Sequence, residues 1–365
     1  MRRPGRADGG SGPSRLPRRL DGSFRTLDIA LDCTDVWKVF GLGAMRHGQF
    51  SESPNPGELL ASWNLAAAVQ QVSLSVRKGE SFCIMGLSGS GKSTLVRCMT
   101  GLLPLTRGSL RVLGIDIARA SPAELIALRR HEISMVFQDF ALLPHLTVVE
   151  NIAFPLRVRG TAKREREARA ERMVAMVGLE GRESYYPHEL SGGQQQRVGI
   201  ARSLATDPQL WFLDEPFSAL DPIIRRDLQD ELLRLQERLR KTIIFITHDF
   251  DEALRLASRI AIMKNGEIAQ IGTPEELVLK PADSYVARFT GKVVLADVVR
   301  VGSVMSPALL DDSSEALDAS MLVREAARRV FERGRAMPVS EAGGRIVGSI
   351  GPQIIGPLLL ARPAS

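Results

Sequence analysis

The chain has 365 residues, of which 44% are hydrophobic and 25% charged, and its formal net charge is +6. This length is sufficient for two domains with packed cores. The sequence contains no run of ~18 apolar residues, so it encodes no membrane span, and any membrane role requires a partner. Its basic residues are not interleaved with aromatic ones, which argues against nucleic-acid binding. Cys33, Cys83 and Cys98 lack metal-ligand spacing and are interpreted as reduced thiols in or near the core of a cytosolic protein.

The first eighty residues contain a polar tail and two expected strands. Residues 1–28 are rich in Gly, Pro, Ser and Arg and lack the apolar core of a secretory signal, so we predict a disordered basic tail. Residues 29–40 favour a strand with an exposed aromatic side chain at its end. Residues 41–66 are expected to form a loop followed by a short helix. Residues 69–78 alternate apolar and polar side chains, as a half-buried antiparallel strand does.

The stretch Ser81–Thr94, SFCIMGLSGSGKST, combines a short apolar run with a glycine-rich loop. The run is typical of a buried parallel strand, and the loop fits the pattern G-x-x-x-x-G-K-[ST]. Its glycines allow tight turns that direct backbone N–H groups at phosphate oxygens. Lys92 supplies a charge for the β- and γ-phosphates and Ser93 a hydroxyl for Mg²⁺, and a helix is expected to begin near Lys92. We assign nucleotide binding to Gly86, Ser88, Gly89, Ser90, Gly91, Lys92, Ser93 and Thr94.

Apolar segments that alternate with helical ones predict a largely parallel sheet with helices on both faces. The expected strands are Ile133–Phe137, Leu210–Leu213, Thr242–Ile246 and Arg259–Met263. Between residues 139 and 205 the strand pattern stops, and residues 161–177 have the charge density and apolar spacing of a solvated amphipathic helix. We therefore predict a mostly helical subdomain at about 139–205, inserted into the sheet domain.

The segment LWFLDEP at Leu210–Pro216 is a hydrophobic strand that ends in two adjacent carboxylates. In a protein with a phosphate-binding loop, Asp214 is placed to hold Mg²⁺ through the water shell of the metal. Glu215 lies just past the strand end, where an attacking water can sit near the γ-phosphate, and it is the candidate general base. The alternative is an acid pair that caps a helix in an ordinary turn, which the presence of the loop at Gly86–Ser93 disfavours.

The sequence LSGGQ at Leu190–Gln194 is the signature motif of ABC-type ATPases, and residues from about 30 to 290 resemble that family. Small residues at the start of a helix allow its N–H groups to approach a phosphate. In the family this motif meets the γ-phosphate of ATP held by the other subunit. The resemblance therefore implies a head-to-tail homodimer that sandwiches two ATP molecules, with nucleotide contacts from Ser191, Gly192, Gly193 and Gln194.

Four further positions match the family. Gln138, in VFQDF, stands at the Q-loop position, which implies contacts with Mg²⁺ and the attacking water. His248, in FITHD, stands at the position of the switch histidine, which contacts the γ-phosphate and orients Glu215. Asp221, in SALD, matches the D-loop at the dimer interface. Phe40 matches the aromatic residue that stacks on adenine, although a simple core aromatic remains an alternative for it.

Three segments resemble one branch of the family. The sequence after Gln138, ALLPHLTVVENIAFPL, resembles the region of bacterial importers that receives the coupling helix of the membrane subunit. The long segment between Phe40 and Val69 resembles the insertion in ATPases of glycine betaine/proline and choline importers. Residues 289–365 resemble one CBS module, a small β-α-β unit whose amphipathic helix we place at residues 316–334.

The predicted fold is therefore an α/β P-loop ABC-type nucleotide-binding domain over residues 29–288. It comprises a mainly parallel sheet, an antiparallel β subdomain and the inserted helical subdomain, and a CBS-like α+β module follows over 289–365.

The resemblance implies an ATP hydrolase that uses ATP and Mg²⁺ to drive uptake of a quaternary-amine compatible solute, such as glycine betaine, proline betaine or choline. The implied partners are a second copy of the chain, integral-membrane permease subunits and a substrate-binding protein or domain, with no nucleic acid. The implied location is peripheral, on the cytoplasmic face of the inner membrane. Alternatives are an ABC transporter ATPase for another cargo and a soluble regulatory ABC-type ATPase, against which Glu215 and His248 argue.

Overall fold

The computed structural model describes residues 28–218, 220–291, 293–308, 310 and 315–360. The basic tail predicted for residues 1–28 lies outside these ranges, apart from Asp28. All helices in the described ranges are too short or too polar to cross a membrane. Cys33, Cys83 and Cys98 are free and buried, as the sequence predicts.

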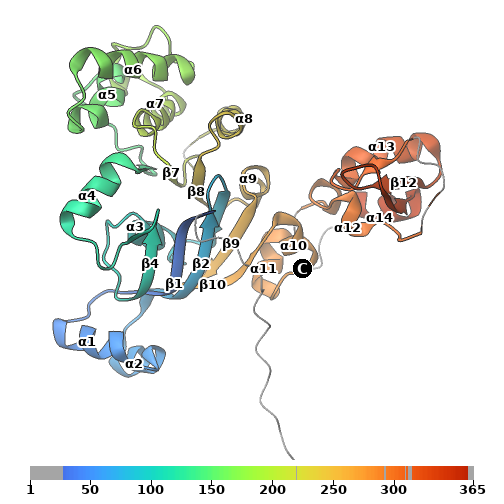
Figure 1. Ribbon diagram of the computed structural model, residues 1–365, viewed down its shortest axis with the longest axis horizontal. Helices are drawn as coiled ribbons and strands as arrows, with labels where there is room; N and C mark the ends of the chain where they lie inside the picture. The colour runs from blue at the N-terminus through green and yellow to red at the C-terminus, as the bar shows by residue number, and fades with distance from the viewer. Residues whose placement is uncertain (1–27, 219, 292, 309, 311–314, 361–365) are drawn as a thin grey trace, which may run out of the picture.

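A six-stranded sheet forms the centre of the larger domain (Figure 1). Its order is β10-β9-β3-β8-β7-β6, and only β10 runs antiparallel to its neighbour. Every residue of β7 and β8 is buried, which explains why these strands read as continuous apolar runs. The strands are β3 (Ser81–Met85), β6 (Ile133–Val136), β7 (Leu210–Asp214), β8 (Thr242–Thr247), β9 (Arg259–Lys264) and β10 (Glu267–Gly272).

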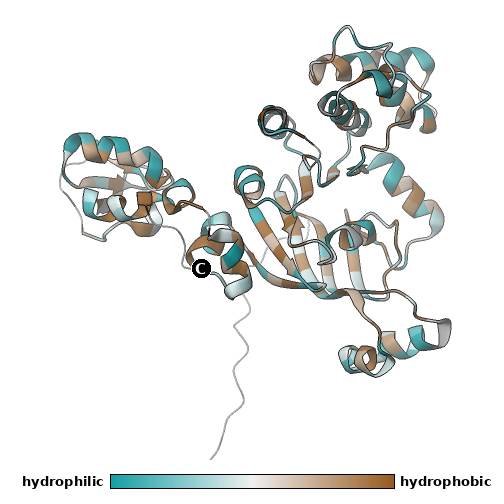
Figure 2. Ribbon diagram, turned by 180° about the vertical axis from the view of Figure 1, so that it is seen from behind, coloured by the Kyte–Doolittle hydropathy of each residue, from teal (hydrophilic) through white to brown (hydrophobic). Residues whose placement is uncertain are grey.

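An antiparallel sheet with the order β2-β1-β4-β5 packs beside the central sheet. The strands predicted at 29–40 and 69–78 are confirmed as β1 (Ile29–Val39) and β2 (Ala67–Arg77). The sequence did not predict β4 (Arg107–Val112), β5 (Ile115–Asp116) or β10. Apolar side chains of both sheets share one core with α3 (Lys92–Met99), and Figure 2 shows the strands as largely hydrophobic.

The segment between β1 and β2 forms two helices. The prediction of a loop followed by one short helix was therefore wrong for the first part of this segment. The two helices are α1 (Ala44–Glu52) and α2 (Pro56–Trp63). A small core of their own holds them against the sheet, because Phe50 is fully buried and meets Trp37 edge-on with 5.6 Å between ring centroids.

Three α-helices occupy the region around residues 139–205, which contains no strand. The amphipathic helix predicted at 161–177 is confirmed as α6 (Lys163–Met176), with Ala170, Met173 and Val174 on its buried side. It packs with α5 (Val148–Val158) and α7 (Gly192–Leu204) in a lobe beside the carboxyl ends of the parallel strands (Figure 1). The other helices of the larger domain are α4 (Pro122–His131), α8 (Pro222–Leu239), α9 (Phe250–Leu256), α10 (Pro274–Leu279) and α11 (Ser284–Thr290).

The C-terminal unit has its own core and lies to one side of the larger domain (Figure 1). The C-terminal unit contains a helix, α13 (Val323–Arg333), between two strands, β11 (Leu317–Asp318) and β12 (Met337–Ser340), but β11 lies inside the range 316–334 that was predicted to be helical. The predicted helix start at residue 316 is wrong, because residues 317–318 pair with β12 and Asp318 accepts hydrogen bonds from Ser320 in a turn. The remaining elements are η3 (Leu295–Asp297), α12 (Val301–Val304), β13 (Ile346–Ile350) and α14 (Pro352–Leu360).

Phe50→Ala tests whether the helix pair α1–α2 depends on its small core. We expect the substitution to cost about 3–5 kcal/mol of local stability, because it removes a fully buried ring from a site with few other apolar side chains. The measurement is limited proteolysis of α1–α2 together with thermal unfolding, with the exposed Gln49→Ala as the control. Equal protease resistance of the two variants would contradict this account of the insertion.

Candidate nucleotide site

The glycine-rich loop connects β3 to α3 and is held by close backbone packing. Gly91 caps α3 with φ +100°, and a Cβ atom there would lie 2.1 Å from the carbonyl oxygen of Ala68. A Cβ atom on Gly86 would lie 2.3 Å from the carbonyl oxygen of Met263. These positions therefore need glycine for space as well as for conformation.

Lys92 begins α3 and is only 5% exposed. Its Nζ donates to the carbonyl oxygens of Gly86, at 2.9 Å, and Leu87, at 3.0 Å, so the ammonium lies across the loop. Burial lowers the pKa of Lys92, and the carboxylates of Glu215 and Asp214 oppose that shift. The chain thus holds one buried positive charge at the centre of the loop.

Ser93 and Asp214 lie together although 121 positions separate them in the sequence. The Ser93 hydroxyl donates to Asp214 Oδ1 at 3.1 Å. Burial raises the pKa of Asp214, whereas the hydrogen bond from Ser93 lowers it. A hydroxyl and a carboxylate are the oxygen ligands that Mg²⁺ uses beside phosphates and water. Two such ligands leave the other positions around the ion to water and phosphate oxygens, as Mg²⁺ prefers. Among the described residues, no group of three or more His, Cys, Asp or Glu is placed to hold a metal ion.

Glu215 and His248 face each other at the ends of β7 and β8. Nδ1 of His248 lies 3.3 Å from Oε2 of Glu215. Glu215 has φ +45°, an uncommon conformation for a residue with a side chain, and its N–H donates to the carbonyl oxygen of Ile246 at 3.2 Å. The backbone bond to the neighbouring strand thus holds this turn in place.

A cavity of about 590 Å³ brings most of the predicted residues together. Gln138, Glu215 and His248 line this cavity together with residues of the loop. The loop residues in the lining are Ser88, Gly89, Gly91, Lys92, Ser93 and Thr94. Gln138 also lines an adjoining cavity with Ser93 and Asp214. The cavity lining also includes Ala68 and Leu87, which the sequence analysis did not predict as site residues.

The predicted residues of the LSGGQ motif and Asp221 do not line this cavity. Ser191 caps α7 by accepting from the N–H of Gln194, and Gln194 Oε1 accepts from the N–H of Ser191 in return. Their helix belongs to the helical lobe (Figure 1), and neither Gly192 nor Gly193 lines the cavity. Asp221 is exposed and accepts from the N–H of Ile223 at 3.1 Å.

Gly86 and Ser90 lie inside the loop rather than on the cavity wall. The ring of Phe40 is 51% exposed, outside the cavity lining, and Lys38 Nζ lies 5.1 Å from its centroid. The sequence also missed Tyr285, whose hydroxyl accepts from the N–H of Leu87 at 3.4 Å and donates to the carbonyl oxygen of Met263 at 3.0 Å. No local sequence pattern could have predicted this contact, because Tyr285 lies 198 positions from Leu87.

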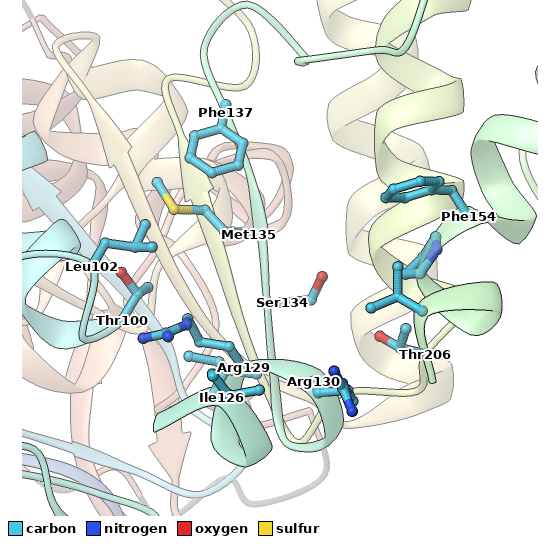
Figure 3. A pocket seen from close by; sticks show the side chains of 13 residues that line it. Thr100, Leu102, Ile126, Arg129, Arg130, Ser134, Met135, Phe137, Phe154 and Thr206 are labelled. Atoms are coloured by element: carbon cyan, nitrogen blue, oxygen red, sulfur yellow. The ribbon is translucent and has the colours of Figure 1, made fainter. Parts of the chain in front are cut away.

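A second, apolar cavity of about 370 Å³ lies between α4, β6 and α5 (Figure 3). We call it the apolar groove; its apolar lining includes Leu102, Ile126, Met135, Phe137, Phe154 and Val158. Three of these side chains, Leu102, Ile126 and Val158, are nearly half exposed. Phe137 lines both the groove and the cavity that holds Asp214, so the two spaces share one wall.

Together, the parallel sheet, the glycine-rich loop and the strand-end carboxylates define a P-loop ATPase. The model of the family described as "ABC transporter" matches residues 69–218. The chain is 48% identical over 329 residues to the trimethylamine N-oxide transport system ATP-binding protein TmoW of Pelagibacter ubique, covering 90% of this chain and 96% of the relative. The TmoW protein of Ruegeria pomeroyi is 50% identical over 88% of this chain and 94% of its own.

A relative with another named cargo is the glycine betaine/proline betaine transport system ATP-binding protein ProV of Escherichia coli. The two proteins are 47% identical over a match that covers 74% of this chain and 68% of ProV. A solved dimeric structure of the ATP-binding cassette MJ0796 in a post-hydrolysis state, bound to ADP and Pi, is 33% identical with a TM-score of 0.57. That match covers 67% of this chain and 98% of the other. The chain belongs to the family of ABC transporter ATP-binding subunits, which couple ATP hydrolysis to transport.

Gly91→Ala tests the packing of the loop. We expect ATP binding to weaken about tenfold or more, because the left-handed conformation alone costs ~1–2 kcal/mol for a residue with a Cβ atom and the methyl group also meets the Ala68 carbonyl. The measurement is titration calorimetry with ATP. Gly114→Ala is the matched control, since Gly114 has φ +86° but open space around its Cβ position. Unchanged affinity in Gly91→Ala would show that the loop accommodates a side chain there.

Proposed function

We propose that Glu215 is the general base of ATP hydrolysis in this chain. The observation that carries the proposal is its 3.3 Å contact with His248, because both residues line the cavity that the loop also lines. In this assignment Glu215 accepts a proton from the attacking water while the water oxygen bonds to the γ-phosphorus and the bond to the bridging oxygen breaks. His248 orients Glu215 and contacts the γ-phosphate, and ADP and phosphate are the products.

The remaining residues of the cavity bind and orient the nucleotide in this proposal. Lys92 and the backbone N–H groups of the loop neutralise the phosphates. Ser93, Asp214 and Gln138 would hold Mg²⁺, which supplies positive charge against the transferring phosphoryl group. Phe40 would stack on adenine, in keeping with its exposed ring at the end of β1.

A second copy of the chain would complete the site. The capped start of α7 presents Ser191 and Gly192 to solvent, outside the cavity of the same chain. A helix start with small residues suits a phosphate, so the geometry supports contact with ATP held by a partner subunit. The solved relative, described as dimeric, supports the same arrangement, and Asp221 would lie at the interface.

The apolar groove supports docking of a permease subunit. Its exposed apolar side chains suit the nonpolar face of a short helix, and Phe137 adjoins Gln138 in the nucleotide cavity. We propose that a cytoplasmic helix of an integral-membrane permease binds there. Binding to this helix would hold the chain peripherally, on the cytoplasmic face of the inner membrane.

We propose as cargo a small methylated amine that serves as a compatible solute. Relatives named for glycine betaine, proline betaine and choline transport support the quaternary amines. The relatives named for trimethylamine N-oxide match 90% and 88% of this chain, more than the relatives named for the other solutes, so this compound belongs in the same test. A substrate-binding protein or domain would deliver the solute to the permease.

Glu215→Gln tests the general base and the direction of transport together. In vesicles that contain this chain and its permease subunits, we expect ATP-driven uptake of labelled trimethylamine N-oxide, glycine betaine or choline. The variant should bind ATP but hydrolyse it at least about 100-fold more slowly, since general-base catalysis contributes 10²–10⁴-fold. Hydrolysis at the normal rate in Glu215→Gln would refute the assignment of the base. Normal hydrolysis without uptake of any of the three solutes would refute the cargo class.

Val158→Glu tests docking at the apolar groove. We expect the affinity for the permease to fall about tenfold, the equivalent of ~1.4 kcal/mol, because a carboxylate would be buried against an apolar partner. ATP binding by the variant chain should be unchanged. The measurement is co-purification of the complex in a dilution series. The control is Ala175→Glu, a substitution at an exposed residue of α6. Normal assembly of Val158→Glu would place the permease elsewhere.

A further inference from the structure

Arg225, near the start of α8, connects the loop at Leu220–Asp221 with the loop at His248–Asp249. Its Nη2 atom donates to the carbonyl oxygen of Leu220, at 3.3 Å, directly before Asp221. Its Nη1 atom donates to Oδ2 of Asp249, at 3.5 Å, directly after His248. One guanidinium therefore touches the loop assigned to the dimer interface and the loop that carries the histidine.

Glu252 completes this connection from α9. Its side chain is buried, and Oε1 lies 3.7 Å from Nε of Arg225. The hydroxyl of Thr247 donates to its other oxygen, Oε2, at 2.6 Å, and accepts from the N–H of Asp249 at 3.0 Å. Thr247 and Asp249, the two neighbours of His248, are thus both tied to the carboxylate that Arg225 faces.

The loop that carries His248 is also anchored to α9 by Asp249. Oδ1 of Asp249 accepts from the N–H groups of Asp251 and Glu252, which leaves Oδ2 for Arg225. Burial raises the pKa of Glu252, while the Thr247 hydroxyl and Arg225 lower it. The positive charge of Arg225 therefore favours the charged form of Glu252, the carboxylate that accepts the hydrogen bond from Thr247 beside His248.

All three contacts of Arg225 are at the long end of their range, between 3.3 and 3.7 Å. Its buried Nε makes no hydrogen bond to any described residue. At these lengths the guanidinium can approach the Leu220 carbonyl, Asp249 or Glu252 more closely. A small movement of the loop at Leu220 would therefore redistribute the guanidinium toward Glu252 and Asp249.

We propose that Arg225 is a positioning residue that transmits the placement of the Leu220–Asp221 loop to His248. When a second subunit orders that loop, the guanidinium tightens on Asp249 and Glu252 and fixes the histidine against Glu215. The planar guanidinium carries five N–H donors in a fixed fork, so one arginine can face a backbone carbonyl and two carboxylates at once. The inference rests on the proposed roles of Glu215, His248 and the dimer.

Arg225→Gln is compared with Arg226→Gln in the transporter complex. Arg226 is the next residue of α8, carries the same charge and is exposed, so it controls for loss of positive charge. We expect Arg225→Gln to lower kcat about tenfold and to reduce the Hill coefficient of ATP hydrolysis toward one, with the Kd for ATP within about twofold of the original. Arg226→Gln should leave all three values unchanged.

A second measurement separates positioning from general support of the fold. Single-turnover hydrolysis is measured for Arg225→Gln alone and in a His248→Ala background. If Arg225 acts through the histidine, the second substitution should cost less than about twofold in that background, because effects of residues that act as a unit are not additive. A further tenfold loss there, or a parallel loss of ATP affinity and thermal stability in Arg225→Gln, would overturn the proposal.

The two proposals fail in different ways. If the original chain hydrolyses ATP and Glu215→Gln does not, the proposed function stands, and normal kcat and cooperativity in Arg225→Gln then refute the positioning role alone. If Glu215→Gln hydrolyses ATP at the normal rate, the assignment of the base fails independently of Arg225.

Discussion

Parallel pairing of β3, β7 and β8 determines where the chemically active side chains of the cavity lie. Met85 pairs with Thr247, and Asp214 pairs with Ile246, so the three strands end at the same level of the sheet. The glycine-rich loop, the Asp214–Glu215 pair and His248 each follow one of these ends. A one-residue shift of β7 would move its side chains to the opposite face and break the contact between Ser93 and Asp214. The apolar runs that bury these strands are therefore also what aligns the site.

The same site carries costs that the rest of the fold must offset. Burial disfavours the charged forms of both Lys92 and Asp214, and each charge partly stabilises the other. Glu215 adopts a left-handed conformation, and Gly91 packs so closely that no side chain fits. Features of this kind persist only where the surrounding structure holds them, here through the fully buried strands β7 and β8 beside β3. The cavity is thus built for charge and strain that a stability optimum would avoid.

Motifs within a few residues of one another were predictable from the sequence, whereas contacts between distant segments were not. The loop, the strand before it and the carboxylate pair each show a local pattern, and the structure brings Lys92, Asp214 and Glu215 together as that pattern suggests. The strands β4 and β10 escaped prediction because exposed and polar residues interrupt their apolar pattern. The roles of Tyr285 and Arg225 depend on tertiary contacts, which the spacing of residues in the sequence does not predict. The late start of α13 reflects a strand pairing at Leu317, which overrides the helical pattern before it.

Two sets of contacts lead toward the nucleotide cavity, one through Phe137 and one through Arg225. In the first set Phe137 forms a wall of the apolar groove and precedes Gln138, so a partner seated in the groove presses on a residue that borders the cavity. In the second set Arg225 links the Leu220 carbonyl to Asp249, which follows His248. Neither connection supplies an atom to the reaction itself. Each can alter only the position of a group that must be placed within a fraction of an ångström for hydrolysis. Under the two proposals, hydrolysis would be fast only with a permease helix in the groove and a second subunit at Leu220–Asp221, which is the property that coupling to transport requires.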